Sequence, residues 1–599
     1  MIKLFKYFRS TWWEVLISLI LVAGQAYAQL QLTDYMGKIT QIVQTGGDVN
    51  EIWIQGGIMI GISVLVLTLA VGTGLLIGHA TSVLAKNVRQ SIYDKVSEFS
   101  LAEYDNFGTS TLLTRITNDV QTVKDTYTMS LRTMVMSPVT LIVAIIMVLT
   151  KDASLAIVLA ISLPIIVITI IVLCVVSIPK FKKIQEAIDH VTVVMREQLT
   201  GVRVVRAFNQ QEYERARFGQ ANDKVKNITI KVERIMTSAN PIITVVFNMT
   251  YIAIFFYGFA RLDGTFIQSD VSDTLSNMMV VAQYTMQIMM SFMMFAMILI
   301  MIPRGQVSAK RINAILETEN TVLDKKDTSL ALNKKQGKGV IEFKDVSFTF
   351  PDAQDPMLHH ISFKTKPGEM TAIIGSTGSG KSTLINLIPR FYDVSEGAIL
   401  FDGVDIRDYS QKDLRDMIGF VPQQALLFSG TIKDNMLFGN QNASDEDIKK
   451  ALDVAQATHF VNKKEEGINA RVSQGGKNFS GGQKQRLAIA RALVKKPEVF
   501  IFDDSFSALD FKTDIKLRRA LKDYVKDASM IVVAQRVSSI LNADNIIVLD
   551  DGVIVGQGKH EQLLKSCPTY LDIVLSQLDP DEIDKTIKLG QQIMEGGEA

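Results

Sequence analysis

The chain has 599 residues, 47% of them hydrophobic, and its mean hydropathy is +0.20. A positive mean is unusual for a soluble enzyme of this length and indicates a membrane protein. The 63 Lys and Arg residues nearly balance the 62 Asp and Glu residues, which excludes a globally basic nucleic-acid-binding protein and an acidic disordered chain. Two distant cysteines, Cys174 and Cys567, exclude a disulfide scaffold and a cysteine metal cluster.

The apolar excess lies in the first half, where we expect a transmembrane domain over residues 1–316. A bilayer-spanning helix needs about 20 apolar residues. Six segments qualify, at about 13–30, 57–78, 134–149, 153–178, 241–259 and 275–302. The first also has features of a secretory signal, with basic residues before an apolar core and Ala26-Tyr27-Ala28 as a cleavage site. Under that alternative, five spans would remain.

The distribution of basic residues predicts that both ends of the chain are cytosolic. Lys and Arg are enriched before the first segment, between the second and third, between the fourth and fifth, and after the sixth. The other connections are short or poor in basic residues, as expected for the outer side. We therefore expect an integral multi-pass protein, with a bacterial plasma membrane favoured and an organellar membrane left open.

Two cytosolic segments of about 50 residues are too long to be turns. Their composition favours helices that extend two spans into the cytosol, with bends near 101–107 and 204–213. These hairpins are either solvated or levers that contact the soluble domain, and position alone does not separate the two interpretations.

The sixth segment carries a stripe of methionines and amides at three- and four-residue spacing. Thioethers are flexible and suit surfaces that accept varied apolar shapes, and amides inside a span are costly unless they face a cavity or a neighbouring helix. The stripe is either packing and lipid-facing surface or the lining of a cavity for amphipathic solutes. Its members are Gln283, Met286, Gln287, Met290, Met294 and Met297.

The second half reads as a soluble α/β domain over 340–580, after a polar linker at 317–339 and before a tail at 581–599. A short apolar strand, 370–374, runs into a glycine-rich loop that matches G-x-x-x-x-G-K-S, and a helix follows. Backbone N–H groups of such a loop and the helix N-terminus bind phosphate, Lys381 reaches the outer phosphates, and Ser382 binds Mg²⁺. The predicted phosphate-binding residues are Gly375, Ser376, Thr377, Gly378, Ser379, Gly380, Lys381, Ser382 and Thr383.

A second buried strand, 499–502, ends in Asp503, which is where P-loop NTPases place a carboxylate that holds Mg²⁺. Upstream, Ser480 and two glycines open another helix, which is a second anion-binding end. One subunit cannot direct two distant ends at one γ-phosphate, whereas two facing subunits can.

With these motifs in place, the sequence resembles an ATP-binding cassette (ABC) exporter half-transporter over almost its whole length, and in particular the degenerate-site subunit of bacterial heterodimeric multidrug exporters. The fold implied is a membrane α-helical domain of six spans with long cytosolic extensions, followed by an α/β P-loop NTPase nucleotide-binding domain. The two cytosolic bends would be coupling helices, the second docking on the partner's nucleotide domain.

The resemblance also assigns roles to individual residues. Phe350 stands where the family stacks an aromatic ring on adenine, residues 375–382 are the Walker A loop, and Gln423 is the Q-loop glutamine that contacts Mg²⁺. The signature motif and the D-loop would contact ATP held by the opposite subunit, through Ser480, Gly481, Gly482, Gln483 and Asp510.

Two positions that matter for hydrolysis depart from the family pattern. Asp504 occupies the place of the glutamate that polarises the attacking water, and its carboxylate reaches about 1.5 Å less far. A misplacement of about 1 Å can cost ~10²-fold in rate. Gln535 occupies the place of the switch histidine, and an amide can bind a γ-phosphate but cannot transfer a proton near neutral pH.

We therefore expect an ATP-hydrolysing translocase that uses ATP and Mg²⁺ and exports amphipathic or hydrophobic compounds, drugs or lipids. Its partner would be a second, different half-transporter with the usual Glu and His. The membrane lipids are its other partner, and no nucleic acid is expected. The alternatives are a nucleotide-gated channel, a regulatory ABC subunit or a homodimeric slow exporter.

Overall fold

The computed structural model describes residues 1–262, 268–325 and 339–577. Most of the predicted linker and the whole predicted tail at 581–599 lie outside these ranges. The chain divides into two compact units: residues 1–97 with 109–318, and residues 98–108 with 319–599.

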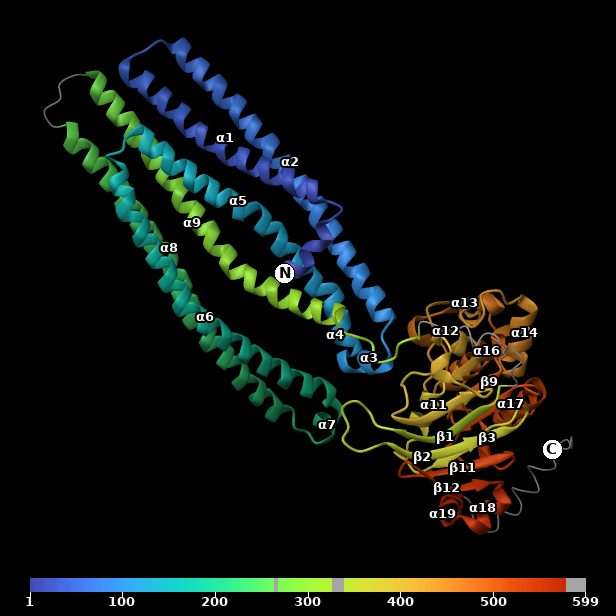
Figure 1. The fold of residues 1–599 in the computed structure, drawn as a ribbon. Helices are drawn as coiled ribbons and strands as arrows, with labels where there is room; N and C mark the ends of the chain where they lie inside the picture. The colour runs from blue at the N-terminus through green and yellow to red at the C-terminus, as the bar shows by residue number, and fades with distance from the viewer. Residues whose placement is uncertain (263–267, 326–338, 578–599) are drawn as a thin grey trace. The chain divides into compact units, whose positions relative to one another are not determined.

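The first unit is helical. Within the described residues it consists of η1 (Ile2–Phe8), α1 (Trp12–Thr45), α2 (Val49–Ser97), α4 (Thr109–Thr114), the π-helix η2 (Arg115–Asp119), α5 (Val120–Lys151), α6 (Ala156–Thr200), α7 (Val202–Ala207), α8 (Gln211–Leu262) and α9 (Gln268–Leu316). Helices α1, α2, α5 and α9 pack against one another, whereas α6 and α8 form a pair that contacts α9 (Figure 1).

Helices of the first unit match the predicted membrane segments. Among the residues that the structure describes, five helical segments have the length and apolar composition to cross a membrane: Trp12–Thr45, Val49–Ser97, Thr109–Lys151, Gln211–Ala260 and Val271–Phe295. The predicted segment 153–178 lies in α6, where the described apolar stretch, Ala156–Thr169, is shorter. The structure thus confirms a membrane-helical domain whose helices extend well beyond the length that a bilayer requires.

The predicted methionine stripe lies on α9. Gln283, Met286, Met290 and Met294 are exposed within this chain, the two outer methionines being 46% and 50% exposed. Gln287 is half-buried, and its Nε2 donates to Thr33 Oγ1 on α1 at 3.0 Å. The side chain of Met297 lies outside the described part of the structure.

In its described part, the second unit contains three sheets. One has the order β2 (Leu358–Lys364), β1 (Ile341–Phe348), β4 (Glu396–Phe401), β5 (Val404–Asp405), and is antiparallel. The six-stranded sheet has the order β12 (Val553–Gly558), β11 (Asn545–Asp550), β3 (Met370–Gly375), β10 (Ser529–Val533), β9 (Val499–Asp503), β6 (Ile418–Val421). It is parallel except for β12. The third pairs β7 (Gly430–Thr431) with β8 (Arg471–Val472).

Helices and short turns complete the second unit. They are α3 (Leu101–Phe107), α11 (Lys381–Leu387), η3 (Ile406–Asp408), α12 (Gln411–Asp416), α13 (Ile432–Leu437), α14 (Asp445–Val454), α15 (Thr458–Asn462), η4 (Gly467–Asn469), η5 (Gln474–Gly476), α16 (Gly481–Val494), α17 (Phe511–Tyr524), η6 (Val537–Ser539), α18 (His560–Ser566) and α19 (Pro568–Gln577).

Strand β9 separates two hydrophobic clusters. Its residues are all buried, and successive side chains of a strand point to opposite faces. Val499 and Ile501 join the cluster that contains α11, whereas Phe500 and Phe502 join the cluster that contains α16. The two helices that the sequence assigned to phosphate binding therefore pack on opposite faces of β9.

The two predicted bends are both short helices. The first is α3, which belongs to the second unit: Leu101 and Ala102 pack against the β1–β2–α11 cluster, and Tyr392 Oη donates to Asp105 Oδ2 at 3.3 Å. The second is α7, which begins two residues before the predicted range and has no buried residue.

Candidate functional site

The glycine-rich loop joins β3 to α11, as the sequence predicted. Gly375 is required by close approach, because a Cβ there would lie 1.9 Å from the carbonyl oxygen of Leu549 on β11. Gly380 has a φ of +95°, which L side chains rarely adopt. These two glycines let the chain leave β3, curl and enter the helix.

Lys381 lies within the curl of the loop. Its Nζ donates to the carbonyl oxygens of Ser376 at 2.6 Å and Gly375 at 3.0 Å. Burial lowers the pKa of its ammonium, and the nearby carboxylates of Asp503 and Asp504 partly offset this effect. The loop therefore encloses a basic side chain, which suits the binding of an anion such as phosphate.

Ser382 and Asp503 meet at the base of the loop. Ser382 Oγ, at the start of α11, donates to Asp503 Oδ1 at the end of β9 over 3.4 Å. Burial raises the pKa of Asp503, and the neighbouring charge of Asp504 adds to the rise. A hydroxyl and a carboxylate oxygen are ligands that Mg²⁺ prefers, so this pair fits the metal of a Mg–nucleotide complex.

Asp504 is buried and has a φ of +46°, in the left-handed region that non-glycine residues seldom adopt. Its N–H donates to the carbonyl oxygen of Val533 on β10 at 3.0 Å. Gln423 Nε2 donates to Asp504 Oδ2 at 3.4 Å. The structure thus brings the predicted Q-loop residue to the carboxylate that follows β9.

The switch position belongs to the same edge of the sheet. β10 lies between β3 and β9, and all three strands are parallel, so the segments that follow them emerge side by side. Gln535 follows β10 by two residues and is exposed. The loop, both aspartates, Gln423 and Gln535 therefore gather at one carboxyl edge of the sheet.

Phe350 lies elsewhere in the unit, at the end of the β1 segment. Its ring packs edge-on against Tyr392 and Phe348, with centroid distances of 5.5 Å and 4.9 Å, and it is half-buried. Its placement leaves part of the ring available for a planar ligand.

The predicted signature segment forms the N-terminus of α16. Gln483 N–H donates to Ser480 Oγ at 3.3 Å, and Ser480 N–H donates to Gln483 Oε1 at 3.1 Å, which is a reciprocal cap. Ser480 and Gly481 are exposed, and Gly482 approaches the Ala508 carbonyl of the D-loop. Asp510 caps α17 by accepting from Thr513 N–H at 3.0 Å.

Two residues that the sequence did not single out also hold this edge. Gln577, at the end of α19, bonds the backbone of Gln535 and Val537, and Arg518, on α17, bonds the carbonyl oxygens of Ser538 and Ser539. Both are far from the switch segment along the chain, so no local pattern could have revealed them.

Comparisons with known proteins agree with this architecture. A family model described as the ABC transporter transmembrane region matches residues 15–302, and one described as ABC transporter matches residues 358–507. The chain is 38% identical to an uncharacterized ABC transporter ATP-binding protein of Mycobacterium tuberculosis, over 92% of this chain and 93% of the relative. It is 31% identical to an ATP-dependent lipid A-core flippase of Syntrophus aciditrophicus, over 84% of this chain and 82% of the relative.

A solved structure of a bacterial Atm1-family ABC exporter with ATP bound has a TM-score of 0.75 and 22% identity. The match covers 95% of this chain and 98% of that one, so the two share a fold. Members of this family span the membrane several times and carry the nucleotide-binding domain in the cytosol, and the bacterial relatives place the chain in a plasma membrane. The chain therefore belongs to the ABC transporter family, as an exporter-type half-transporter with one transmembrane domain and one ABC ATPase domain.

Proposed function

We propose that the protein exports amphipathic or hydrophobic compounds, drugs or lipids, as one half of a heterodimer in which its own Walker A site hydrolyses ATP slowly. One observation carries the proposal: Asp504 and Gln535 occupy the two hydrolytic positions of a site that otherwise has its phosphate loop, Ser382 and Asp503. Binding is retained while two groups needed for fast hydrolysis are replaced.

The slow step follows from reach and protonation. Asp504 is one methylene shorter than Glu, and an error of about 1 Å in placing a reacting group costs ~10²-fold. Its carboxylate already accepts a hydrogen bond from Gln423. Gln535 can donate a hydrogen bond to a phosphate oxygen, but its amide does not take up a proton at neutral pH.

The second site of the dimer would use this chain's intact signature segment. Because α11 and α16 pack on opposite faces of β9, the Walker A loop and Ser480 of one chain serve different nucleotides. Ser480 is exposed and pre-organised by its cap, ready for a phosphate held by a partner. A partner with Glu and His at the two hydrolytic positions would make this second site fast.

In this account ATP drives transport because it favours the closed pair of nucleotide domains over the open pair. Lys381 and the loop N–H groups would bind the phosphates, and Ser382 and Asp503 would hold the Mg²⁺ that offsets their negative charge. Asp504 and Gln423 would position the attacking water poorly, so hydrolysis at this site would be slow. ATP would then remain bound here while the partner site hydrolyses its own ATP. Closure is passed to the helices through α3 and α7.

The substrate class rests on the exposed methionine stripe of α9. Met286, Met290 and Met294 present flexible apolar surface, about half of which the described residues of this chain leave exposed. The relatives described as lipid A-core flippases support a lipid or lipid-like cargo. Changing these three methionines to serine should reduce the range of cargo compounds that are transported, or abolish transport, while ATP binding is retained. An unchanged range of cargo would show that the stripe does not line the transport pathway.

The hydrolytic claim is tested by restoring the usual pair, Asp504→Glu with Gln535→His, in the purified transporter. We expect ATP turnover at this chain's site to rise by roughly 10- to 100-fold, because the carboxylate regains its reach and the switch regains a titratable group. The readout is the rate at which labelled phosphate is released from γ-phosphate-labelled ATP bound to this chain.

A matched control is Lys381→Ala, which should abolish nucleotide retention by this chain. If the restored pair turned over ATP at the original rate and the two sites stayed as unequal as before, the slow-site role would be wrong. Cargo-dependent ATP turnover separates the exporter from the alternatives, since a nucleotide-gated channel or a regulatory subunit would not couple hydrolysis to cargo. A homodimeric slow exporter would show two equal slow sites.

A further inference from the structure

The backbone of the switch segment is held by two side chains from distant helices. Gln577 Nε2 donates to the carbonyl oxygen of Gln535 at 2.8 Å, and the N–H of Val537 donates to Gln577 Oε1 at 2.9 Å. A carboxamide is suited to this task because it carries one donor and one acceptor group on a single plane. One side chain thus bridges the two backbone groups that flank Arg536.

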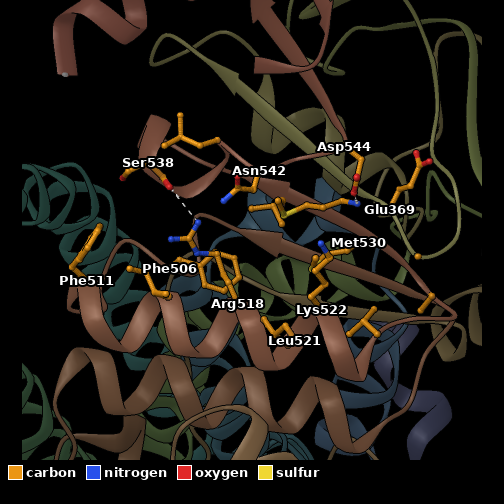
Figure 2. Close-up of a pocket in the computed structure, with 17 residues that line it drawn as sticks. Glu369, Phe506, Phe511, Arg518, Leu521, Lys522, Met530, Ser538, Asn542 and Asp544 are labelled. Atoms are coloured by element: carbon orange, nitrogen blue, oxygen red, sulfur yellow. Dashed lines mark hydrogen bonds between the residues drawn. The ribbon is translucent and has the colours of Figure 1, made fainter. Parts of the chain in front are cut away.

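The residues that follow, Ser538 and Ser539, are held by Arg518 on α17, the helix that follows the D-loop. Arg518 Nη1 donates to the carbonyl oxygens of Ser539 at 2.8 Å and Ser538 at 3.2 Å. Its Nε and Nη2 donate to the buried carboxylate of Asp514 at 2.9 Å and 2.7 Å, which fixes the guanidinium. Figure 2 shows Arg518 reaching toward Ser538. Both residues line a cavity of about 100 Å³.

Helix α19, whose last residue is the exposed Gln577, is itself anchored by buried side chains. Tyr570 and Val574 on α19 are fully buried in the cluster that contains Ala534 and Val537 on either side of the switch. The residue before the switch is fixed as well, because Ala534 N–H donates to the Ile373 carbonyl of β3. Only the turn at Gln535 and Arg536 is exposed, and Gln577 closes that turn.

We infer that Gln577 is a positioning residue for the switch: it holds the backbone of Gln535 so that the Gln535 amide meets the γ-phosphate, and it makes α19 part of the ATP site. This inference rests on the proposed role of Gln535. Without the bridge, Gln535 retains its side chain, but its carbonyl oxygen and the N–H of Val537 both lose their partner.

The experiment compares ATP with ADP at this chain's own Walker A site in the full-length, reconstituted transporter. The concentrations of ATP and of ADP that displace photoreactive azido-ATP from this chain give the ratio of the two affinities, which reports contact with the γ-phosphate. Gln577→Ala removes both bonds, and the isosteric Gln577→Glu keeps the acceptor for Val537 but turns an oxygen toward the Gln535 carbonyl.

Both variants should lower the ATP-to-ADP affinity ratio by roughly three- to tenfold, the value of one net hydrogen bond, with ADP affinity unchanged. The matched control is Gln562→Ala, because Gln562 caps α18 by accepting from Lys559 N–H at 3.1 Å. That variant should leave the ratio unchanged. A purely structural role for Gln577 would instead lower the unfolding temperature and both affinities together.

Gln535→Ala distinguishes the two levels of the argument. A lowered ratio in Gln535→Ala, with a wild-type ratio in both Gln577 variants, would overturn the positioning role and leave the proposed function standing. A wild-type ratio in all three variants would overturn the positioning role together with the γ-phosphate contact of Gln535 on which it rests, whereas the slow-site claim is decided separately by the restored pair.

Discussion

At the scale of single residues, the site contains a local motif that can be recognised in the sequence and contacts between distant residues that form only when the chain folds. The loop glycines, Lys381 and Ser382 follow a spacing that predicts phosphate binding, and in the structure they lie at the junction of β3 and α11. The contact between Gln423 and Asp504 joins residues 81 positions apart, and it forms because β6 and β9 are neighbouring parallel strands. Sequence alone named both residues but not the bond between them.

Substitution of Arg518 tests how much the ion pair with Asp514 on α17 contributes to the stability of the chain. The guanidinium of Arg518 pairs with the carboxylate of Asp514. Burial raises the pKa of Asp514, and the nearby guanidinium partly offsets that rise. Arg518→Met leaves that carboxylate without its partner, and removing one member of a buried ion pair costs about 3–5 kcal/mol. Chemical unfolding of the full chain should show this loss, and the double variant Arg518→Met with Asp514→Leu should recover much of it.

If the double variant were as unstable as the single one, the cost would come from the bonds to Ser538 and Ser539 rather than from the stranded carboxylate. A single variant of wild-type stability would show that the ion pair contributes nothing.

His560 predicts a pH dependence of the nucleotide-binding unit. It is buried, its Nδ1 pairs with Tyr570 Oη at 2.7 Å, and burial lowers its pKa below the ordinary value of about 6.5. As pH falls through about 6.5, the unfolded chain takes up a proton that the folded chain accepts only at lower pH. Stability should therefore decline below that pH, until the folded form is protonated as well.

Unfolding midpoints measured in detergent at several values between about pH 7.5 and 5.5 check this expectation. His560→Asn should flatten the decline, whereas His459→Asn, at an exposed position, should leave it as it is. A decline of the same size in His560→Asn would assign the effect to other groups.

At the scale of elements, α3 shows how a cytosolic bend becomes part of the soluble unit. Its N-terminus is a capping box: Glu103 accepts from the N–H and the hydroxyl of Ser100, and also from Thr321 N–H at 3.0 Å. One carboxylate therefore joins the helix to the segment that follows α9. The sequence predicted a bend at 101–107, but the bond to Thr321 spans 218 positions and could not be read from it.

Glu103→Ala should weaken the transmission between ATP turnover and cargo. We expect the variant to lose about 1–2 kcal/mol of stabilisation at the α3 N-terminus, because this one side chain accepts hydrogen bonds from three donors there. Cargo-stimulated ATP turnover should fall while the basal rate is retained. Glu103→Gln keeps one acceptor oxygen, so its cargo-stimulated turnover should lie between those of the wild type and Glu103→Ala. Equal stimulation in the wild type and both variants would exclude a role of α3 in coupling.

The long helices were predictable in kind but not in detail. Apolar runs of bilayer length and basic cytosolic flanks were sufficient to place them, because the membrane dictates both features. The π-helix at Arg115–Asp119 was not predictable, since it depends on packing: buried Asp119 accepts from Ser308 Oγ of α9 at 2.7 Å. Contacts between helices far apart in sequence decide such local geometry.

At the scale of the whole molecule, two features of the chain call for a second subunit. Helix α16, which begins at the signature segment, packs on the face of β9 opposite the Walker A helix. Helix α7 ends the α6–α8 pair with no buried residue, and nearby Phe208 is 72% exposed. The family and the two-domain plan were predictable because their motifs are local. The identity of the partner was not, because it lies on another chain.

The central claim is that this chain pairs with a different half-transporter and contributes the slow ATP site. Native mass spectrometry of the transporter, extracted gently from its own membrane, tests it most directly. The account predicts one copy of this chain with one copy of a second ABC half-transporter, whose sequence has Glu after its Walker B strand and His at the switch. A complex of two copies of this chain would contradict it, because Asp504 and Gln535 would then occupy both sites.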